Sequence, residues 1–234
     1  MSGFARLAFH PVPEVGRRDT SLRYTDILFG FVIRELFLRL QNWPQLDRVV
    51  KWHLMTATVL VLGSWIGYRR SLNRSSYEVK FFNVPFWRFV VDQFMLVVYF
   101  RMAVLTTTPQ TSGLDWQQLV LDTTRLTAYV FASYVVWDLL GLWMSVATDS
   151  QGAVVRPRYP MVDADDNPTT SAVALDWIGF GITTAAFIAV AALWLLAGLP
   201  NPWAVLPALI IVLLAYRWSK EMRTSWLLQR FRQS

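Results

Sequence analysis

Long apolar runs separated by short polar stretches dominate the hydrophobicity pattern along the chain. Six of these runs reach or approach the roughly 20 residues that an α-helix needs to cross a bilayer. They lie at about residues 24–42, 49–68, 86–107, 125–146, 176–197 and 203–220. Two connections, at residues 42–45 and 198–203, contain proline and are so short that their flanking helices must be antiparallel neighbours. The pattern therefore predicts an all-α polytopic membrane protein with six transmembrane helices.

Lysine and arginine are unevenly distributed between the two sets of loops. One set comprises the N-terminus, the loop after the second run and the C-terminal tail, with Arg6, Arg17, Arg18, Arg23, Arg69, Arg70, Arg74, Lys80, Arg217, Lys220, Arg223, Arg230 and Arg232. The other set has Arg48 and Lys51, followed by residues 106–124 without any basic residue. Because basic loops stay in the cytoplasm, both termini are expected there.

This topology divides the chain into three parts. Residues 1–23 form a cytoplasmic N-terminal segment without the apolar run of a signal peptide. Residues 24–220 form the six-helix domain, with a cytoplasmic loop at about 148–175, and residues 221–234 form a basic cytoplasmic tail. The tail alternates apolar and basic side chains, which suits either anionic lipid or an ordinary basic flank. The expected location is a bacterial plasma (inner) membrane.

The composition excludes several classes of protein. The chain is 54% hydrophobic and 16% charged, whereas a soluble domain has about 25% charged residues. It has no cysteine, and its two histidines, His10 and His53, belong to no catalytic motif. The Asp163–Asn167 run has Pro168 where a calcium-binding loop needs glycine. We therefore expect no enzyme activity, catalytic residue, cofactor or metal site, and we interpret the net charge of +6 as a topology signal rather than nucleic-acid binding.

Ionisable residues inside the apolar runs are the candidate functional groups, because charge is costly in lipid. Asp26, Asp92, Asp138 and Asp176 are expected in one tier near the cytoplasmic side. Each is either a structural carboxylate or part of an ion pathway; capping of a helix start would suffice for Asp176 and is also an option for Asp26. Nearer the opposite side we expect Arg34, Glu35, Arg39, His53 and Arg101.

Local spacing predicts two charge pairs. Glu35 and Arg39 are four residues apart on one helix, as are Arg88 and Asp92, so the members of each pair can meet on one helical face. Arg34 and Arg101 complete the charge-pair candidates. These pairings favour structural roles for the residues of the two pairs.

The first run has a distinctive beginning, Tyr24-Thr25-Asp26, followed by Gly30 and Ile33. With about 100° per residue, Asp26, Gly30 and Ile33 stay near one helical face, and Glu35 lies on the opposite face. One face therefore offers a carboxylate, a small residue for close helix approach and apolar side chains.

Residues 24–33 resemble the six-helix prokaryotic relatives of the lysosomal potassium channel, whose first helix begins with an aromatic-Ser-Asp motif. The resemblance implies a cation pathway lined by the first helix in a tetrameric or pseudo-fourfold assembly. It implies that Asp26, Thr25 and Tyr24 lie at the pathway mouth and that Gly30 and Ile33 lie along the pathway. The chain departs from the family pattern at Thr20, where the family has arginine, and at Arg34-Glu35, which interrupts the apolar face.

Three functions remain open at this point. The first is a cation channel, potassium-like and homo-oligomeric, that conducts monovalent cations along the first helix. The second is a proton- or ion-coupled secondary transporter in which Asp26, Asp92 and Asp138 hold the ion in turn. The third is a non-transporting membrane subunit that acts through protein contacts.

Overall fold

A computed structural model of the chain describes the backbone of residues 19–72, 82, 84–105, 115–146, 170–199 and 202–231. Within these ranges it describes the side chains of residues 24–69, 82, 84, 86–105, 115–143, 177–199 and 202–222. The elements are the helices α1 (Asp19–Leu40), α2 (Arg48–Leu72), α3 (Val84–Val104), α4 (Trp116–Val146), α5 (Thr170–Ala197) and α6 (Val205–Phe231), with the 3₁₀ turns η1 (Trp43–Gln45) and η2 (Pro202–Ala204). No strand occurs in these ranges, which confirms the all-α prediction.

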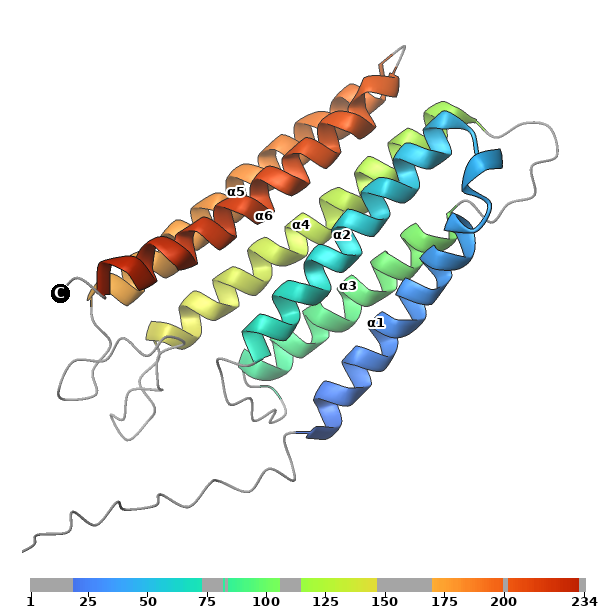
Figure 1. Cartoon of the computed structure of the whole chain (residues 1–234). Coiled ribbons are helices and arrows are strands. Elements are labelled where there is room, and N and C mark those ends of the chain that lie inside the picture. The colour runs from blue at the N-terminus through green and yellow to red at the C-terminus, as the bar shows by residue number, and fades with distance from the viewer. Residues whose placement is uncertain are drawn as a thin grey trace, which may run out of the picture.

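The six helices lie roughly side by side and alternate in direction (Figure 1). Helix α1 packs against α2 and α3, while α4 packs against α3 and α5. Helices α5 and α6 form a hairpin that lies against α4 and α2. The start of α1 and the end of α6 are consequently at the same end of the bundle (Figure 1).

Several helix boundaries differ from the predicted ones by more than a turn, including the starts of α1, α4 and α5 and the end of α6. Helix α4 begins nine residues early, at Trp116, because the Asp115 carboxylate accepts backbone hydrogen bonds from Gln117 (3.0 Å) and Gln118 (3.3 Å). Helix α5 begins at Thr170, so Asp176 lies inside the helix and the cap interpretation was wrong. Helix α6 continues unbroken to Phe231.

Capping is also the wrong interpretation for Asp26. Helix α1 begins at Asp19, which places Asp26 about two turns into the helix. Its carboxylate is therefore too far along the helix to accept bonds from the first-turn amides.

Four of the six helices are long and apolar enough to cross a membrane: α2, α4, α5 and α6. Helix α1 contains Asp26, Arg34, Glu35 and Arg39, and α3 contains Arg88, Asp92 and Arg101, so neither has an equally apolar stretch. The structure thus supports part of the predicted topology, namely an all-helical protein with at least these four candidate spans.

All six helices contribute to one apolar core. Its buried members include Phe29, Leu54, Met102, Phe131, Val190 and Leu209, one from each helix. The outside of the bundle is also apolar: Ile188 and Leu195 of α5 and Ile211 of α6 are each more than 60% exposed. Such exposed apolar surface is unfavourable in water and matches a lipid environment.

Candidate functional site

Asp26 is held between α1 and α2. Its Oδ2 forms an ion pair with Arg69 Nη2 at 3.0 Å, and its Oδ1 accepts a hydrogen bond from the Trp65 indole at 3.2 Å. The neighbouring Thr25 is buried and hydrogen-bonds Tyr68. Asp26 and Thr25 therefore attach the first part of α1 to the last part of α2.

The other candidate residues of α1, Tyr24, Gly30 and Ile33, differ in how exposed they are. Tyr24 is about half exposed, and a Cβ atom added at Gly30 would meet no atom within 4 Å, so no helix of the described structure approaches closely there. Ile33 is instead half-buried and packs against the core. Tyr24, Ile27, Gly30 and Phe31 form an α1 face that is open to the surroundings, and the exposed residues Arg34, Phe37 and Leu38 follow further along the helix.

The predicted charge residues of α1 and α3 lie in different surroundings. Glu35 and Arg39 form the ion pair that their spacing predicts, at 2.5 Å. Arg34 and Arg101 are exposed. Arg88, which the spacing pairs with Asp92, is buried with its guanidinium carbon 3.7 Å from the centre of the Trp137 ring of α4. A cation over an indole face is stabilised by the ring's negative charge density, so Arg88 connects α3 to α4.

Asp138 is the centre of a polar cluster between α4, α5 and α6. Its Oδ2 lies 2.9 Å from Lys220 Nζ and accepts a hydrogen bond of 2.5 Å from the Thr183 hydroxyl. The side chains of Asp138 and Lys220 are only 15% and 18% exposed. Tyr216 lies beside Thr183, and Lys220 lies over its ring. The structure thus supplies a basic partner that no residue near Asp138 in the sequence suggested.

Helix α6 also contacts α2 through Arg217. Its Nη2 donates a hydrogen bond to the Gly63 carbonyl, and a Cβ atom added at Gly67 would lie 2.7 Å from Nη1 and 2.8 Å from Nη2. Gly63 and Gly67 are one turn apart on α2. The guanidinium therefore lies in a groove that depends on the missing side chain at Gly67, whereas a Cβ atom added at Gly63 would make ordinary contact, 3.5 Å from Arg217 Nε.

A cavity of about 420 Å³ adjoins this groove. It lies between α2, α4 and α6, with apolar walls and a few polar groups from Gly63, Ser64, Tyr134, Tyr216, Arg217 and Glu221. This size and mixture of walls is typical of sites for small molecules. We refer to it as the α2–α4–α6 cavity.

Three hydroxyl groups meet at one edge of the α2–α4–α6 cavity. The Tyr99 hydroxyl donates to Ser64 Oγ at 2.8 Å and lies 2.9 Å from the Tyr134 hydroxyl, and Ser64 and Tyr134 are also hydrogen-bonded to each other. The Ser64 hydroxyl can in turn donate to the Leu60 carbonyl at 2.6 Å. This hydroxyl triangle joins α2, α3 and α4 without any charge.

His53 makes a second uncharged junction between the same three helices. It is fully buried, with Nε2 3.1 Å from the Met102 carbonyl of α3 and Nδ1 2.7 Å from the Thr123 hydroxyl of α4. Because a carbonyl can only accept, Nε2 carries the proton. The Thr123 hydroxyl has one proton and lies within hydrogen-bond distance of both Nδ1 and the Leu119 carbonyl, the latter at 2.6 Å.

Within the described side chains, no three histidine, cysteine, aspartate or glutamate residues lie close enough to hold a metal ion. The site is instead a set of ion pairs and hydroxyl contacts between helices.

The apolar helices and exposed apolar surface define an integral membrane protein. No protein family, curated protein or solved structure matches the chain.

Sequence reasoning missed several polar residues of this set. Tyr99, Tyr134, Thr183 and Ser64 are uncharged and stand out in no pattern, and Lys220 was interpreted as part of the basic flank. The spacing of Gly63 and Gly67 was a usable signal, because small residues four apart mark close helix contacts.

Proposed function

We propose that all six helices cross the membrane, with both termini in the cytoplasm of a bacterial cell. Helices α1 and α3 have 22 and 21 residues, a length of about 30 Å that suffices to cross a bilayer. Several of their charges have partners inside the protein, including Asp26 with Arg69 and Glu35 with Arg39. Pairing of this kind lowers the cost of charge at membrane depth.

Within that membrane, we propose that the protein is an ion-coupled secondary transporter of a small molecule. The observation that carries this proposal is the Asp138–Lys220 ion pair, which joins two helices apolar enough to cross a membrane. Ionisable residues at membrane depth commonly hold protons or ions in pumps and transporters. Asp138 is the proposed site of a coupling proton or monovalent cation.

The α2–α4–α6 cavity is the proposed site of the transported molecule. Tyr216 connects it to Asp138, because it lines the cavity and lies beside Thr183, which donates to the carboxylate. A proton or cation on Asp138 weakens the carboxylate's attraction for Lys220. Helix α6 then loses this attachment to α4 while Arg217 still holds it to α2. The resulting movement of α6 opens the cavity and couples ion binding to access.

The test uses purified protein in liposomes on a solid-supported membrane, with sudden steps of pH or of sodium or potassium concentration. The parent should give a brief charge displacement as the ion binds, and Asp138→Asn should abolish it. Asp122→Asn is the matched control, because Asp122 lies on the same helix and pairs locally with Arg125 at 2.7 Å. A sustained current would favour a channel. No response from folded parent protein would refute both and favour a non-transporting subunit.

A cation channel between copies of the chain is the second candidate. It is favoured by α1, where Tyr24, Ile27 and Phe31 are each more than half exposed beside Gly30. Since the chain has no cysteine, a single Ile27→Cys variant should form disulfide-linked pairs in membranes if copies meet there. Ile188→Cys on α5, 62% exposed, is the control. Equal cross-linking of both variants would contradict a specific α1 interface.

A further inference from the structure

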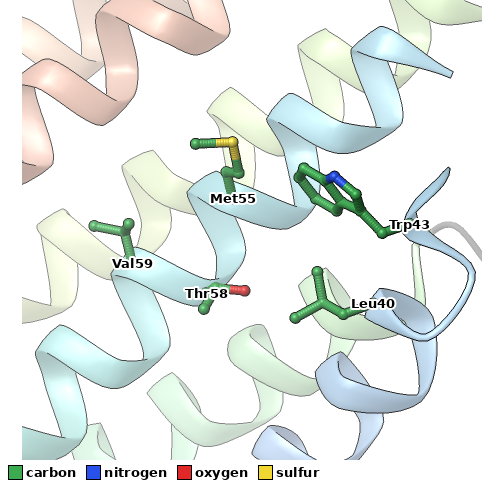
Figure 2. A pocket seen from close by; sticks show the side chains of 5 residues that line it. All are labelled: Leu40, Trp43, Met55, Thr58 and Val59. Carbon is green, nitrogen blue, oxygen red and sulfur yellow. The ribbon is translucent and has the colours of Figure 1, made fainter. Parts of the chain in front are cut away.

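An open pocket of about 380 Å³ lies at the corner between α1 and α2 (Figure 2). Leu40 at the end of α1 and Trp43 of η1 form one side, and Met55, Thr58 and Val59 of α2 form the other. None of these five side chains carries a charge. The pocket therefore suits an uncharged molecule.

Thr58 distinguishes this pocket from an ordinary lipid-facing hollow. Its Oγ1 atom is buried and has no hydrogen-bond partner, and it is the one such hydroxyl in the part of the chain whose side chains are described. Figure 2 shows the oxygen pointing from α2 toward Leu40, between the two sides of the pocket.

Other threonines in these helices behave differently. Thr56 donates to the carbonyl of Trp52 at 2.8 Å, and Thr127 donates to that of Thr123 at 2.8 Å. This bond to the carbonyl four residues earlier is the usual way to satisfy a hydroxyl inside a membrane helix. Thr58 makes no such bond, so its hydroxyl keeps an unused donor and acceptor beneath the surface of the pocket.

The depth of Thr58 restricts the source of a partner. It lies ten residues after the start of α2 at Arg48, about 15 Å along the helix axis. Water is scarce at that depth in a bilayer, so a buried hydroxyl there needs a partner from protein or lipid.

We propose that this pocket binds an uncharged membrane lipid, with the Thr58 hydroxyl donating to a carbonyl oxygen of the lipid. The indole of Trp43, held beside Lys51 with Nζ 5.9 Å from the ring centre, offers an aromatic surface at the pocket. A planar ring can stack on such a surface, and the Met55 sulfur can pack against its edge. These features favour a lipid quinone over an acylglycerol, although both have the required carbonyl oxygen.

The test measures binding of three probes to the purified protein in neutral detergent by calorimetry. Decylubiquinone supplies the quinone ring, dioctanoylglycerol supplies ester carbonyls, and decylbenzene supplies a ring and chain without oxygen. The parent should bind decylubiquinone more tightly than decylbenzene. Thr58→Val should weaken decylubiquinone binding about three- to tenfold, the range for one hydrogen bond, and leave decylbenzene binding unchanged.

Two further variants distinguish binding in this pocket from binding elsewhere on the protein. Thr56→Val removes a buried hydroxyl that lies outside the pocket and should leave all three affinities unchanged. Met55→Trp fills the space and should abolish binding of every probe. Because valine removes an unsatisfied hydroxyl, Thr58→Val should also raise the melting temperature of the ligand-free protein by about 2–4 °C.

The outcomes decide the proposal independently of any transport activity. Binding of dioctanoylglycerol, in place of decylubiquinone, that depends on Thr58 would support the site and identify an acylglycerol as the lipid. The proposal would be overturned if neither decylubiquinone nor dioctanoylglycerol bound more tightly than decylbenzene, or if Thr58→Val left the affinity of the bound probe or the melting temperature unchanged.

Discussion

Replacing Lys220 by methionine tests whether the Asp138–Lys220 pair holds α6 to α4. The substitution keeps most of the apolar stem of the side chain and removes the ammonium group. Asp138 then stays mostly buried, 15% exposed, with a hydrogen bond from Thr183 but without the cation 2.9 Å away. The carboxylate must either remain uncompensated or take up a proton, and both cost free energy.

The expected magnitude follows from the geometry. At 2.9 Å and an effective dielectric constant of about 20, the Coulomb attraction is about 6 kcal/mol, most of it offset by desolvation of the two charges. Removing one partner of a buried pair costs about 3–5 kcal/mol, and the remaining exposure of this pair favours the lower end. We therefore expect Lys220→Met to lower the free energy of unfolding by about 3 kcal/mol. Asp138→Asn should cost about 2 kcal/mol, because asparagine still accepts a bond from Thr183.

The double variant measures the interaction between the two charges, apart from the cost of losing each side chain. If the two charges act on each other, Asp138→Asn with Lys220→Met should cost about 3 kcal/mol rather than the sum of about 5 kcal/mol, a coupling of about 2 kcal/mol. The assay is reversible unfolding in mixed micelles with increasing denaturing detergent, measured for parent, single and double variants. A double variant equal to the sum of the singles within about 0.5 kcal/mol would refute the ion pair as an attachment of α6.

Three further predictions concern the other interhelical contacts. Gly67→Ala would bring a carbon 2.7 Å from the Arg217 guanidinium, which must then shift. Losing its hydrogen bond to Gly63 should cost about 1 kcal/mol in the same unfolding assay. Gly30→Ala, with no atom within 4 Å, should be neutral or stabilise by about 0.5 kcal/mol, so similar losses for both would contradict the groove. His53→Phe removes two buried hydrogen bonds and should cost about 2 kcal/mol; unchanged unfolding would contradict its role as a junction. Asp26→Asn leaves Trp65 a partner and loses only the attraction of Arg69, 56% exposed, so it should cost less than about 1 kcal/mol, and a larger loss would contradict this assignment.

The long apolar runs predicted the number and approximate position of the helices, because burying a backbone in lipid requires helices of a definite length. They predicted the start of α4 poorly. Its first turns follow the Asp115 cap and mix buried apolar residues, Leu119 and Val120, with polar ones such as Gln117, Gln118 and Asp122, so they do not form one continuous apolar run. The charged residues that made α1 and α3 candidates for function also make these two helices less apolar, so they are not among the four candidate membrane spans.

Local and distant contacts differ in how far the sequence predicts them. The Glu35–Arg39 pair follows from helical spacing alone. Lys220 is 82 residues from Asp138, and their meeting depends on the packing of α4 against the α5–α6 hairpin. No periodicity within one helix encodes that arrangement. Uncharged polar groups such as Ser64 and Thr58 are harder still, because their roles depend on which neighbour their single hydroxyl reaches.

The hydroxyl triangle of Ser64, Tyr99 and Tyr134 has a consequence for biogenesis. Its members belong to α2, α3 and α4 alone, so the junction is complete as soon as α4 has been inserted during synthesis. His53 closes a second junction among the same helices at that moment. The first four helices can therefore assemble while α5 and α6 are still being made, and the hairpin then docks on a finished surface.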